Sequence, residues 1–185
     1  MSRMFEQPYS EVKERPFARR LWAVVNATIF KVVTNRMRMR LLRCFGAKLD
    51  GYLVVNPTVR IYAPWHLYVA KPWAVLAPGV EVYNKADVKL GAHTIVSQGA
   101  YLCTASHDVS SPVMALITKP IVLEDDTWVA AKAVVLPGVT MHEGSVAGCA
   151  AVVSKDVEAW TVVCGNPAKI TGKRVLSPDT SATTK

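Results

Sequence analysis

The sequence predicts an all-β solenoid, a parallel β-helix built from six-residue repeats. From Leu123 onward, six consecutive hexads keep one register: LEDDTW, VAAKAV, VLPGVT, MHEGSV, AGCAAV and VSKDVE. The first position of each hexad is an aliphatic residue or Ala, and the fifth is small or β-branched. A helix repeats every 3.6 residues and a half-buried strand every two. A period of six instead fits coils in which one short strand and one corner fill each unit.

The same pattern extends upstream, with one break. Earlier hexads begin at Val55, Ile61, Leu90, Val96 and Leu102, and the last three carry Thr94, Ala100 and Ser106 in fifth place. Residues 67–89 are repeat-like with a slipped register. Counting in sixes from Leu102 puts a hexad start on Pro120, whereas the observed start is Leu123. The slip predicts an excursion loop at about 108–120 that leaves the β-helix and returns out of phase.

The N-terminal part precedes the repeats and has a helical pattern. Between residues 19 and 45, apolar side chains recur at helical spacing, and Gly46 is a typical stop. The ends of a β-helix expose strand edges and core, so we expect the helices to cap one end and the C-terminal segment to cover the other. The expected division is a mainly helical cap over 1–48, a β-helix domain over 49–165, and a C-terminal segment over 166–185. Residues 1–15 are expected to form a poorly ordered arm, and 177–185 a disordered tail.

The positive charge is concentrated in this N-terminal part. The 185 residues carry a formal net charge of +8, and residues 1–50 hold 11 Lys and Arg against 4 Asp and Glu. No nucleic-acid-binding motif accompanies the charge, so nucleic acid is not an expected partner. Two interpretations stay open: a solvated capping helix, or attraction to an anionic membrane surface or a lipid-linked anionic glycan.

Length and cysteine usage indicate a single intracellular domain. At 51% hydrophobic residues the chain can bury a sizeable core. The four cysteines form no CxxC motif, and the sequence shows no convincing secretory signal, so free thiols in a reducing cytosol are expected. The apolar stretch 21–33 is too short and too polar to span a bilayer. The expected location is therefore cytoplasmic, or peripheral at the inner membrane surface if the basic part binds lipid.

Four local motifs carry a resemblance to a known family. They are VSQGAYLCTASHD at 96–108, ITKPI at 117–121, VVLPGVT at 134–140 and GNPAK at 165–169. Upstream, LLRCFGAK at 41–48 and PWHL at 64–67 look like the colanic acid subgroup. Over about residues 36–173 the chain resembles the hexapeptide-repeat acyltransferases. Within that family it is most similar to sugar O-acetyltransferases of the colanic acid, maltose/galactoside and nodulation type.

This resemblance implies a fold and a function. It implies a left-handed β-helix with three hexads per coil, and a homotrimer with sites between subunits. It also implies acetyl transfer from acetyl-CoA to a sugar hydroxyl, in exopolysaccharide or cell-surface glycan biosynthesis. The chain departs from the family where Gly is usual at the second hexad position, with Glu124, Ala130 and His142 instead. A non-catalytic repeat scaffold or binding protein is the alternative function.

His107 is the candidate catalytic base. Acetyl transfer needs a base within hydrogen-bond reach of the acceptor hydroxyl, and histidine titrates near working pH. His107 stands where the coil breaks into the loop, and the resemblance matches it to the family's base. The alternative is a loop histidine that only bonds backbone. Asp108 either orients the imidazole or shapes the loop.

Neither a metal site nor a cysteine nucleophile is expected. A metal site would need three histidines converging from neighbouring coils, and His93, His107 and His142 offer no close pair, so no metal is expected. Cys103 lies inside a regular hexad, where a small packed thiol is more typical than a nucleophile paired with His107.

The remaining site residues are implied by the resemblance. The CoA arm is expected along the β-helix surface between subunits, beside Ala131 and Cys149. Lys155 and Lys169 match basic residues near the CoA phosphates, although both also fit ordinary solvated lysines. Two further residues are expected on the substrate side: Trp128 would either wall the site or serve as surface packing, and Asn84 would face the acceptor hydroxyl.

Overall fold

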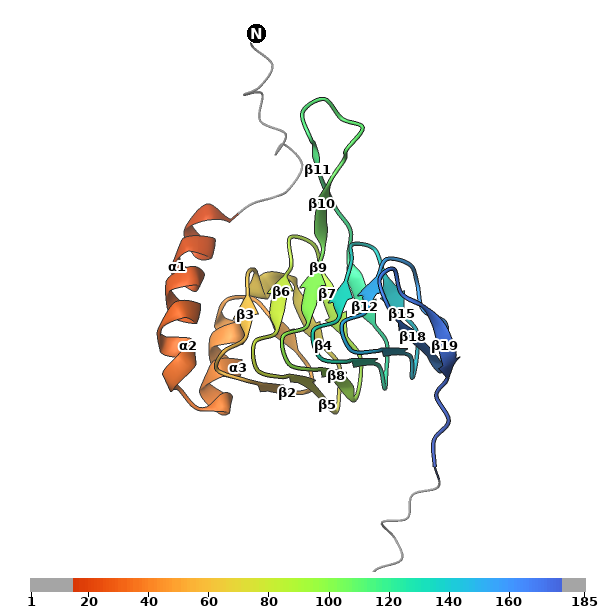
Figure 1. The fold of residues 1–185 in the computed structure, drawn as a ribbon. Helices are drawn as coiled ribbons and strands as arrows, with labels where there is room; N and C mark the ends of the chain where they lie inside the picture. Colours follow the sequence, from red (N-terminus) through yellow and green to blue (C-terminus); the bar gives the residue numbers. More distant parts are fainter. Residues whose placement is uncertain (1–14, 178–185) are drawn as a thin grey trace, which may run out of the picture.

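The computed structural model describes residues 15–177, in which the hexads stack as coils of a parallel β-helix with three sheets (Figure 1). Sheet 1 holds β1 (Lys48–Leu49), β4 (Leu67–Val69), β7 (Val88–Leu90), β12 (Ile121–Leu123) and β15 (Thr140–Met141). Sheet 2 holds β2 (Tyr52–Val55), β5 (Trp73–Leu76), β8 (Thr94–Val96), β13 (Trp128–Val129), β16 (Val146–Ala147), β18 (Thr161–Cys164) and β19 (Lys169–Lys173). Sheet 3 holds β3 (Arg60–Ile61), β6 (Glu81–Tyr83), β9 (Tyr101–Cys103), β14 (Val134–Val135) and β17 (Val152–Val153). The chain visits sheets 1, 2 and 3 in turn, so residues one coil apart lie on neighbouring strands.

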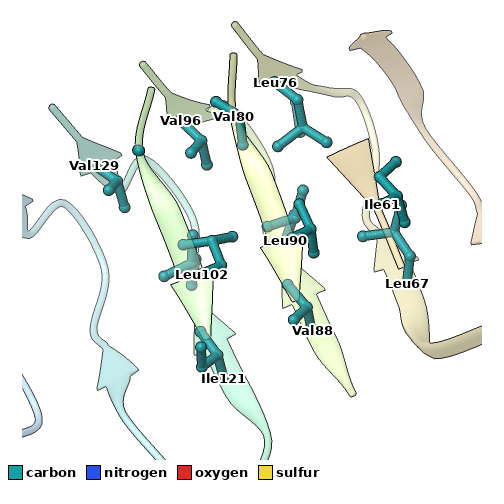
Figure 2. Packing of buried hydrophobic residues seen from close by; sticks show 14 of the residues in the cluster. Ile61, Leu67, Leu76, Val80, Val88, Leu90, Val96, Leu102, Ile121 and Val129 are labelled. Atoms are coloured by element: carbon teal, nitrogen blue, oxygen red, sulfur yellow. The ribbon is translucent and has the colours of Figure 1, made fainter. Parts of the chain in front are cut away.

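The core is formed by the hexad positions identified in the sequence. The six first-position residues from Leu123 to Val153 are at most 1% exposed, and the six fifth-position residues from Thr127 to Val157 at most 3%. Leu90, Val96 and Leu102, from the three sides of an earlier coil, point into the same core (Figure 2). The predicted parallel β-helix is therefore confirmed. Its period of six arises because each side of a coil has one strand residue and one corner residue that point into the core.

The excursion is a β-hairpin rather than an irregular loop. β10 (Ala105–His107) pairs antiparallel with β11 (Leu116–Thr118), and Figure 1 shows this hairpin projecting from the solenoid. It begins three residues before the expected position 108. Ser106, which hexad counting places in the core, is an exposed residue of β10. The counting is wrong there because β10 pairs with the returning strand and no longer with a neighbouring coil.

The predicted helical stretch 19–45 is three helices. They are α1 (Pro16–Ala27), α2 (Ile29–Val32) and α3 (Asn35–Cys44). The chain breaks at Thr28, with φ −122° and ψ −85°, and is extended at Val33 and Thr34. Pro16 starts α1 at a position where its missing N–H costs nothing. Gly46, at φ +95°, ends the helical part as expected.

The helices cover the open N-terminal end of the β-helix. Asn26 on α1 donates to the Val59 carbonyl (3.2 Å), and Trp22 donates to Ile61 on β3. On α3, Asn35 accepts from the Val55 N–H of β2 at 2.9 Å. Strand edges that would otherwise be unpaired are thus satisfied, which confirms the predicted helical cap.

The C-terminal segment covers the other end. β19 pairs antiparallel with β18 at the edge of sheet 2. At the edge of sheet 3, Val152 donates to the Gly165 carbonyl and accepts from the Ala168 N–H, each at 2.9 Å. The expectations for residues 1–14 and 178–185 lie outside the described residues. Within 15–177, no helix is both long enough and apolar enough to cross a bilayer.

The helical cap leaves apolar side chains in solvent. Trp22, Val25 and Phe30 are buried. Five other apolar side chains of α1 and α2 are exposed: Phe17 (79%), Leu21, Val24, Ile29 and Val32 (85%). The apolar repeat seen in the sequence therefore contains two faces, and only one of them packs on the β-helix.

Candidate active site

A cleft of about 1320 Å³ lies between α1, the strands β3 and β6, and the β10–β11 hairpin. Its wall on the hairpin side includes His107 and Leu116. Aromatic side chains of Tyr62, Trp65 and Tyr83 line the side formed by the β-helix. The hairpin thus brings the predicted base to the mouth of a cleft that no single element forms alone.

The imidazole of His107 is held by a backbone carbonyl. Its Nδ1 lies 2.6 Å from the carbonyl oxygen of Met114, on the returning side of the hairpin. A carbonyl only accepts, so Nδ1 must carry the hydrogen, and in the neutral ring Nε2 then keeps its lone pair. The exposed ring therefore presents Nε2 as a proton acceptor.

Asp108 shapes the hairpin turn in this structure. Its Oδ1 accepts hydrogen bonds from the hydroxyl (2.6 Å) and the N–H (2.9 Å) of Ser110. These bonds, the hydroxyl first, hold the pKa of the Asp108 carboxyl below its usual range. Side chains of neighbouring strand residues point apart, so Asp108 bonds its own turn while Met114 orients the ring. A carbonyl seven residues away has no signature in the sequence.

Asn84 braces a corner at the back of the cleft. Its amide oxygen accepts from the Ala63 N–H (2.9 Å), and its amide nitrogen donates to the Ala63 carbonyl (2.7 Å). The residue is fully buried although it lines the cleft. One amide N–H is left by these two bonds, and the predicted contact with an acceptor hydroxyl rests on it.

Three of the predicted cofactor residues lie along one edge of the β-helix, between sheets 2 and 3. The Ala131 carbonyl accepts from the N–H of Ala150, next to the exposed Cys149. Ala131 and Cys149 stack because 18 residues, one full coil, separate them. Lys169 is exposed at the start of β19, directly beyond the next corner of that edge.

Lys155 lies at the following corner, between sheets 3 and 1. It is six residues after Cys149, one side of the same coil, so the width of sheet 3 separates it from the edge of Ala131. Its neighbour Asp156 accepts from the Thr140 N–H at 2.8 Å and closes that corner. The structure therefore brings together Ala131, Cys149 and Lys169, and places Lys155 one corner away.

Trp128 belongs to an apolar ladder on the outer face of sheet 2. The ladder is defined by outward residues in direct register on successive strands: Val54, Val75, Ile95, Trp128, Val146 and Val162. Ile95 is 37% and Trp128 44% exposed. The Trp128 indole donates to the Ser97 hydroxyl at 2.9 Å, which orients the ring along the surface. The equivalent positions of sheet 1 include Lys48 and Lys89.

The predicted catalytic and cofactor residues occupy separate surfaces of one chain. The cleft at His107 is lined by none of the described residues Trp128, Ala131, Cys149, Lys155 and Lys169. Within a single chain, the cleft therefore lies beside the predicted base His107, and the predicted cofactor residues lie on another surface.

The other histidines each pair with a carboxylate. Nδ1 of His66 bonds Asp87 (2.7 Å), and that of His93 bonds Asp126 (3.1 Å). Nδ1 of His142 lies 3.2 Å from a carboxylate oxygen of Glu124. Among residues 15–177, no three His, Cys, Asp or Glu side chains group as metal ligands. Cys103 is buried, and its thiol donates to the Ala105 carbonyl.

The cleft contains residues that the sequence analysis did not identify. Tyr62 and Tyr83 meet edge to face with ring centroids 5.0 Å apart. Burial, and then the charge of Glu81, raises the pKa of Tyr62, so its phenol stays protonated. The PWHL motif contains Trp65, but nothing in the sequence places it in the same cleft as His107.

Comparison with known proteins agrees with this fold. No protein-family model matches the chain. The chain is 40% identical over 158 residues to the colanic acid biosynthesis acetyltransferase WcaF of Escherichia coli, covering 84% of this chain and 86% of that protein. A hexapeptide-repeat acetyltransferase from Vibrio cholerae, complexed with acetyl coenzyme A, superposes with a TM-score of 0.76 at 25% identity, covering 85% and 87% of the two chains. A maltose O-acetyltransferase from Clostridium difficile gives 0.77 at 19% identity, covering 87% and 88%.

The β-helix of hexads and the match to a hexapeptide-repeat acetyltransferase place the chain in the class of the hexapeptide-repeat acyltransferases. Within that class, the chain belongs to the colanic acid biosynthesis acetyltransferase family. The predicted family and the predicted enzyme class are therefore confirmed.

Proposed function

We propose that this enzyme transfers an acetyl group from acetyl-CoA to a sugar hydroxyl in exopolysaccharide or cell-surface glycan biosynthesis, with His107 as general base. The observation that carries the proposal is the His107 ring, whose Nδ1 is bonded to Met114 and whose Nε2 is available at the mouth of the cleft. The acetyl coenzyme A bound to the Vibrio cholerae protein and the colanic acid relative support the donor and the pathway class.

The chemistry follows from that tautomer. Nε2 takes the proton of the acceptor hydroxyl as its oxygen attacks the thioester carbonyl, and a new C–O bond forms. When the C–S bond breaks, the imidazolium returns the proton to the departing CoA sulfur. The Met114 carbonyl stabilises the positive ring between these two steps through the Nδ1–H bond.

We place the CoA along the edge of Ala131 and Cys149, with Lys169 and Lys155 near its phosphates and Trp128 beside the site. The enzyme would then be a homotrimer in which His107 of one subunit faces this edge of another. Two observations support that arrangement: the base and the edge lie apart within one chain, and the apolar ladder gives one side of the prism a surface suited to subunit contact.

Acceptor-dependent release of CoA tests the proposed function. With acetyl-CoA and a panel of sugars, sugar nucleotides and lipid-linked oligosaccharides, we expect thiol release above the acceptor-free rate with at least one acceptor. Mass spectrometry should show one added acetyl group on that acceptor. Thiol release that no acceptor accelerates would instead favour the non-catalytic scaffold or binding protein.

We further propose that the exposed face of α1 and α2 rests on an anionic membrane surface. Leu21 and Val24 lie on this face, and the exposed cations Arg20 and Lys31 belong to the same two helices. Apolar insertion together with basic flanks is the typical pattern of helices that lie in a membrane interface. The expected location is then the cytoplasmic face of the inner membrane.

Vesicle sedimentation checks this contact. The full chain should bind anionic vesicles more strongly than neutral ones, and salt should weaken the binding because it screens the charges. The double variant Leu21→Ser/Val24→Ser should bind about thirtyfold more weakly, since each of the two side chains loses roughly 1 kcal/mol of burial in the membrane interface. Val175→Ser/Leu176→Ser, which changes exposed residues at the opposite end, is the matched control. Equal, salt-insensitive binding to both vesicle types would rule out the proposal.

A further inference from the structure

A histidine–aspartate pair stands at the wall of the cleft and has no part in the transfer chemistry. Nδ1 of His66 lies 2.7 Å from Oδ1 of Asp87, and both residues are partly buried. His66 lines the same cleft as His107 and belongs to the PWHL motif. The sequence therefore carries a histidine in this cleft to which the proposed mechanism gives no role.

The pair lies in line with the base of the β10–β11 hairpin. Strands β4, β7 and β12 are in direct register, so the residues just before them, His66, Asp87 and Pro120, occupy one column on successive coils. The Asp87 carbonyl accepts from the Ile121 N–H at 2.9 Å, where the chain returns from the hairpin. Neighbouring coils are about 4.8 Å apart, so His66 stands about 10 Å from the hairpin base.

Position in the cleft distinguishes this pair from the other two histidine–carboxylate pairs. His93 and His142 also place Nδ1 against a carboxylate, but neither lines the cleft. A carboxylate only accepts, so Asp87 fixes Nδ1 of His66 as a donor and leaves Nε2 for another partner. Within residues 15–177, Asp87 is the one hydrogen-bond partner of the His66 imidazole. The ring is thus held in place with one unused polar atom.

A hydroxyl group matches what this nitrogen can bind. A sugar hydroxyl both donates and accepts, so it can bond Nε2 whether the ring is neutral or protonated. Asp87 already orients the imidazole, so little side-chain freedom is lost when a ligand binds. The reacting hydroxyl must lie at His107 on the hairpin, because that residue is the proposed base. A hydroxyl at His66 is therefore a different, non-reacting hydroxyl of the acceptor.

We propose that His66 is a specificity-determining residue, whose Nε2 bonds one non-reacting hydroxyl of the acceptor sugar and so fixes which hydroxyl reaches His107. This inference rests on the proposed function and deepens it, because it assigns the choice among the hydroxyls to a named side chain. Asp87 is then a positioning residue, which orients the imidazole from outside the cleft lining.

Kinetics with acceptors that lack single hydroxyls test this role. The probes are methyl glucoside, methyl galactoside and maltose, each with its monodeoxy analogues. Loss of one non-reacting hydroxyl should raise the wild-type KM about fivefold or more, which corresponds to roughly 1 kcal/mol for a hydrogen bond. His66→Asn should raise the KM of the parent sugar by a similar factor and remove the difference between parent and analogue.

The His66→Asn variant separates sugar binding from structure. Its amide can still donate to Asp87, whereas the nitrogen at the position of Nε2 is lost. The KM for acetyl-CoA and the melting temperature should therefore stay at wild-type values, while NMR of the product should show more than one acetylated position. His93→Asn is the matched control, because His93 is paired with Asp126 in the same way but lies outside the cleft.

A measurement without turnover keeps this inference apart from the proposed function. In the ¹⁵N spectrum of the histidine side chains, with CoA bound, the Nε2 resonance of His66 should shift when one of the three sugars is added, and that of His93 should not. A shift without transfer to any acceptor would support the sugar contact and overturn the proposed function. An unmoved His66 resonance, or equal KM changes in His66→Asn and His93→Asn, would overturn the inference, and transfer to any acceptor would still leave the proposed function intact.

Discussion

His107→Ala is expected to reduce acetyl transfer about 10²–10⁴-fold, the usual contribution of a positioned general base. The fold should be unaffected, because the side chain is exposed on the projecting hairpin and packs in no core. CoA affinity should persist, since the predicted cofactor residues line a different surface. Steady-state kinetics with an active acceptor, together with CoA titration by calorimetry, measures both quantities on the same preparation.

His142→Ala is the matched control for this substitution. His142 bonds Glu124 on the β-helix surface and lies outside the cleft, so its loss should change the rate by less than a few-fold. If the His107→Ala enzyme retained activity within a few-fold of wild type, His107 would be a loop histidine that only bonds backbone.

Ile95→Glu should dissociate the enzyme into folded subunits and abolish transfer with the assembly. Ile95 stands in the middle of the apolar ladder, in register with Val75 on one side and Trp128 on the other. An unpaired carboxylate buried there costs several kcal/mol, enough to weaken association about a hundredfold or more. Light scattering at micromolar concentration should show a trimer for the wild type and a monomer for the variant.

Val122→Glu controls for the introduced charge. Val122 faces outward on sheet 1 in register with Lys89, which can pair with the new carboxylate. This variant should stay trimeric and active. A wild-type monomer, or a monomeric Ile95→Glu variant with full activity, would contradict a site shared between subunits.

The sequence alone was sufficient for the core. A repeat of six places the first and fifth positions inside the coil, and from Leu123 to Val157 all of them are buried as that pattern requires. The pattern fails only at Ser106 among the fifth positions named above, because that residue lies on the hairpin. The signal is strong because each hexad meets the same local environment, so the pattern does not depend on distant contacts. The register slip also located the excursion, although it could not show that β10 and β11 pair from Ala105 onward.

The same reasoning could not separate the two faces of α1. Trp22 is buried because it reaches the Ile61 carbonyl of β3, whereas Leu21 and Val24 have equally good helical spacing and stay in solvent. Helical periodicity indicates that a face is apolar, but packing on a partner element decides which apolar face is covered.

What the sequence determined by itself is the family, the coil, the core and the place of His107 at the coil-to-hairpin break. Only the tertiary structure decided what surrounds that histidine. The Met114 carbonyl that sets its tautomer, the rings of Tyr62 and Trp65, and the cations of α1 meet across long stretches of chain. The physical reason is that a repeat specifies each coil from its neighbours. A cleft between a helix, a hairpin and a sheet depends on how separate elements dock, and no local period records that docking.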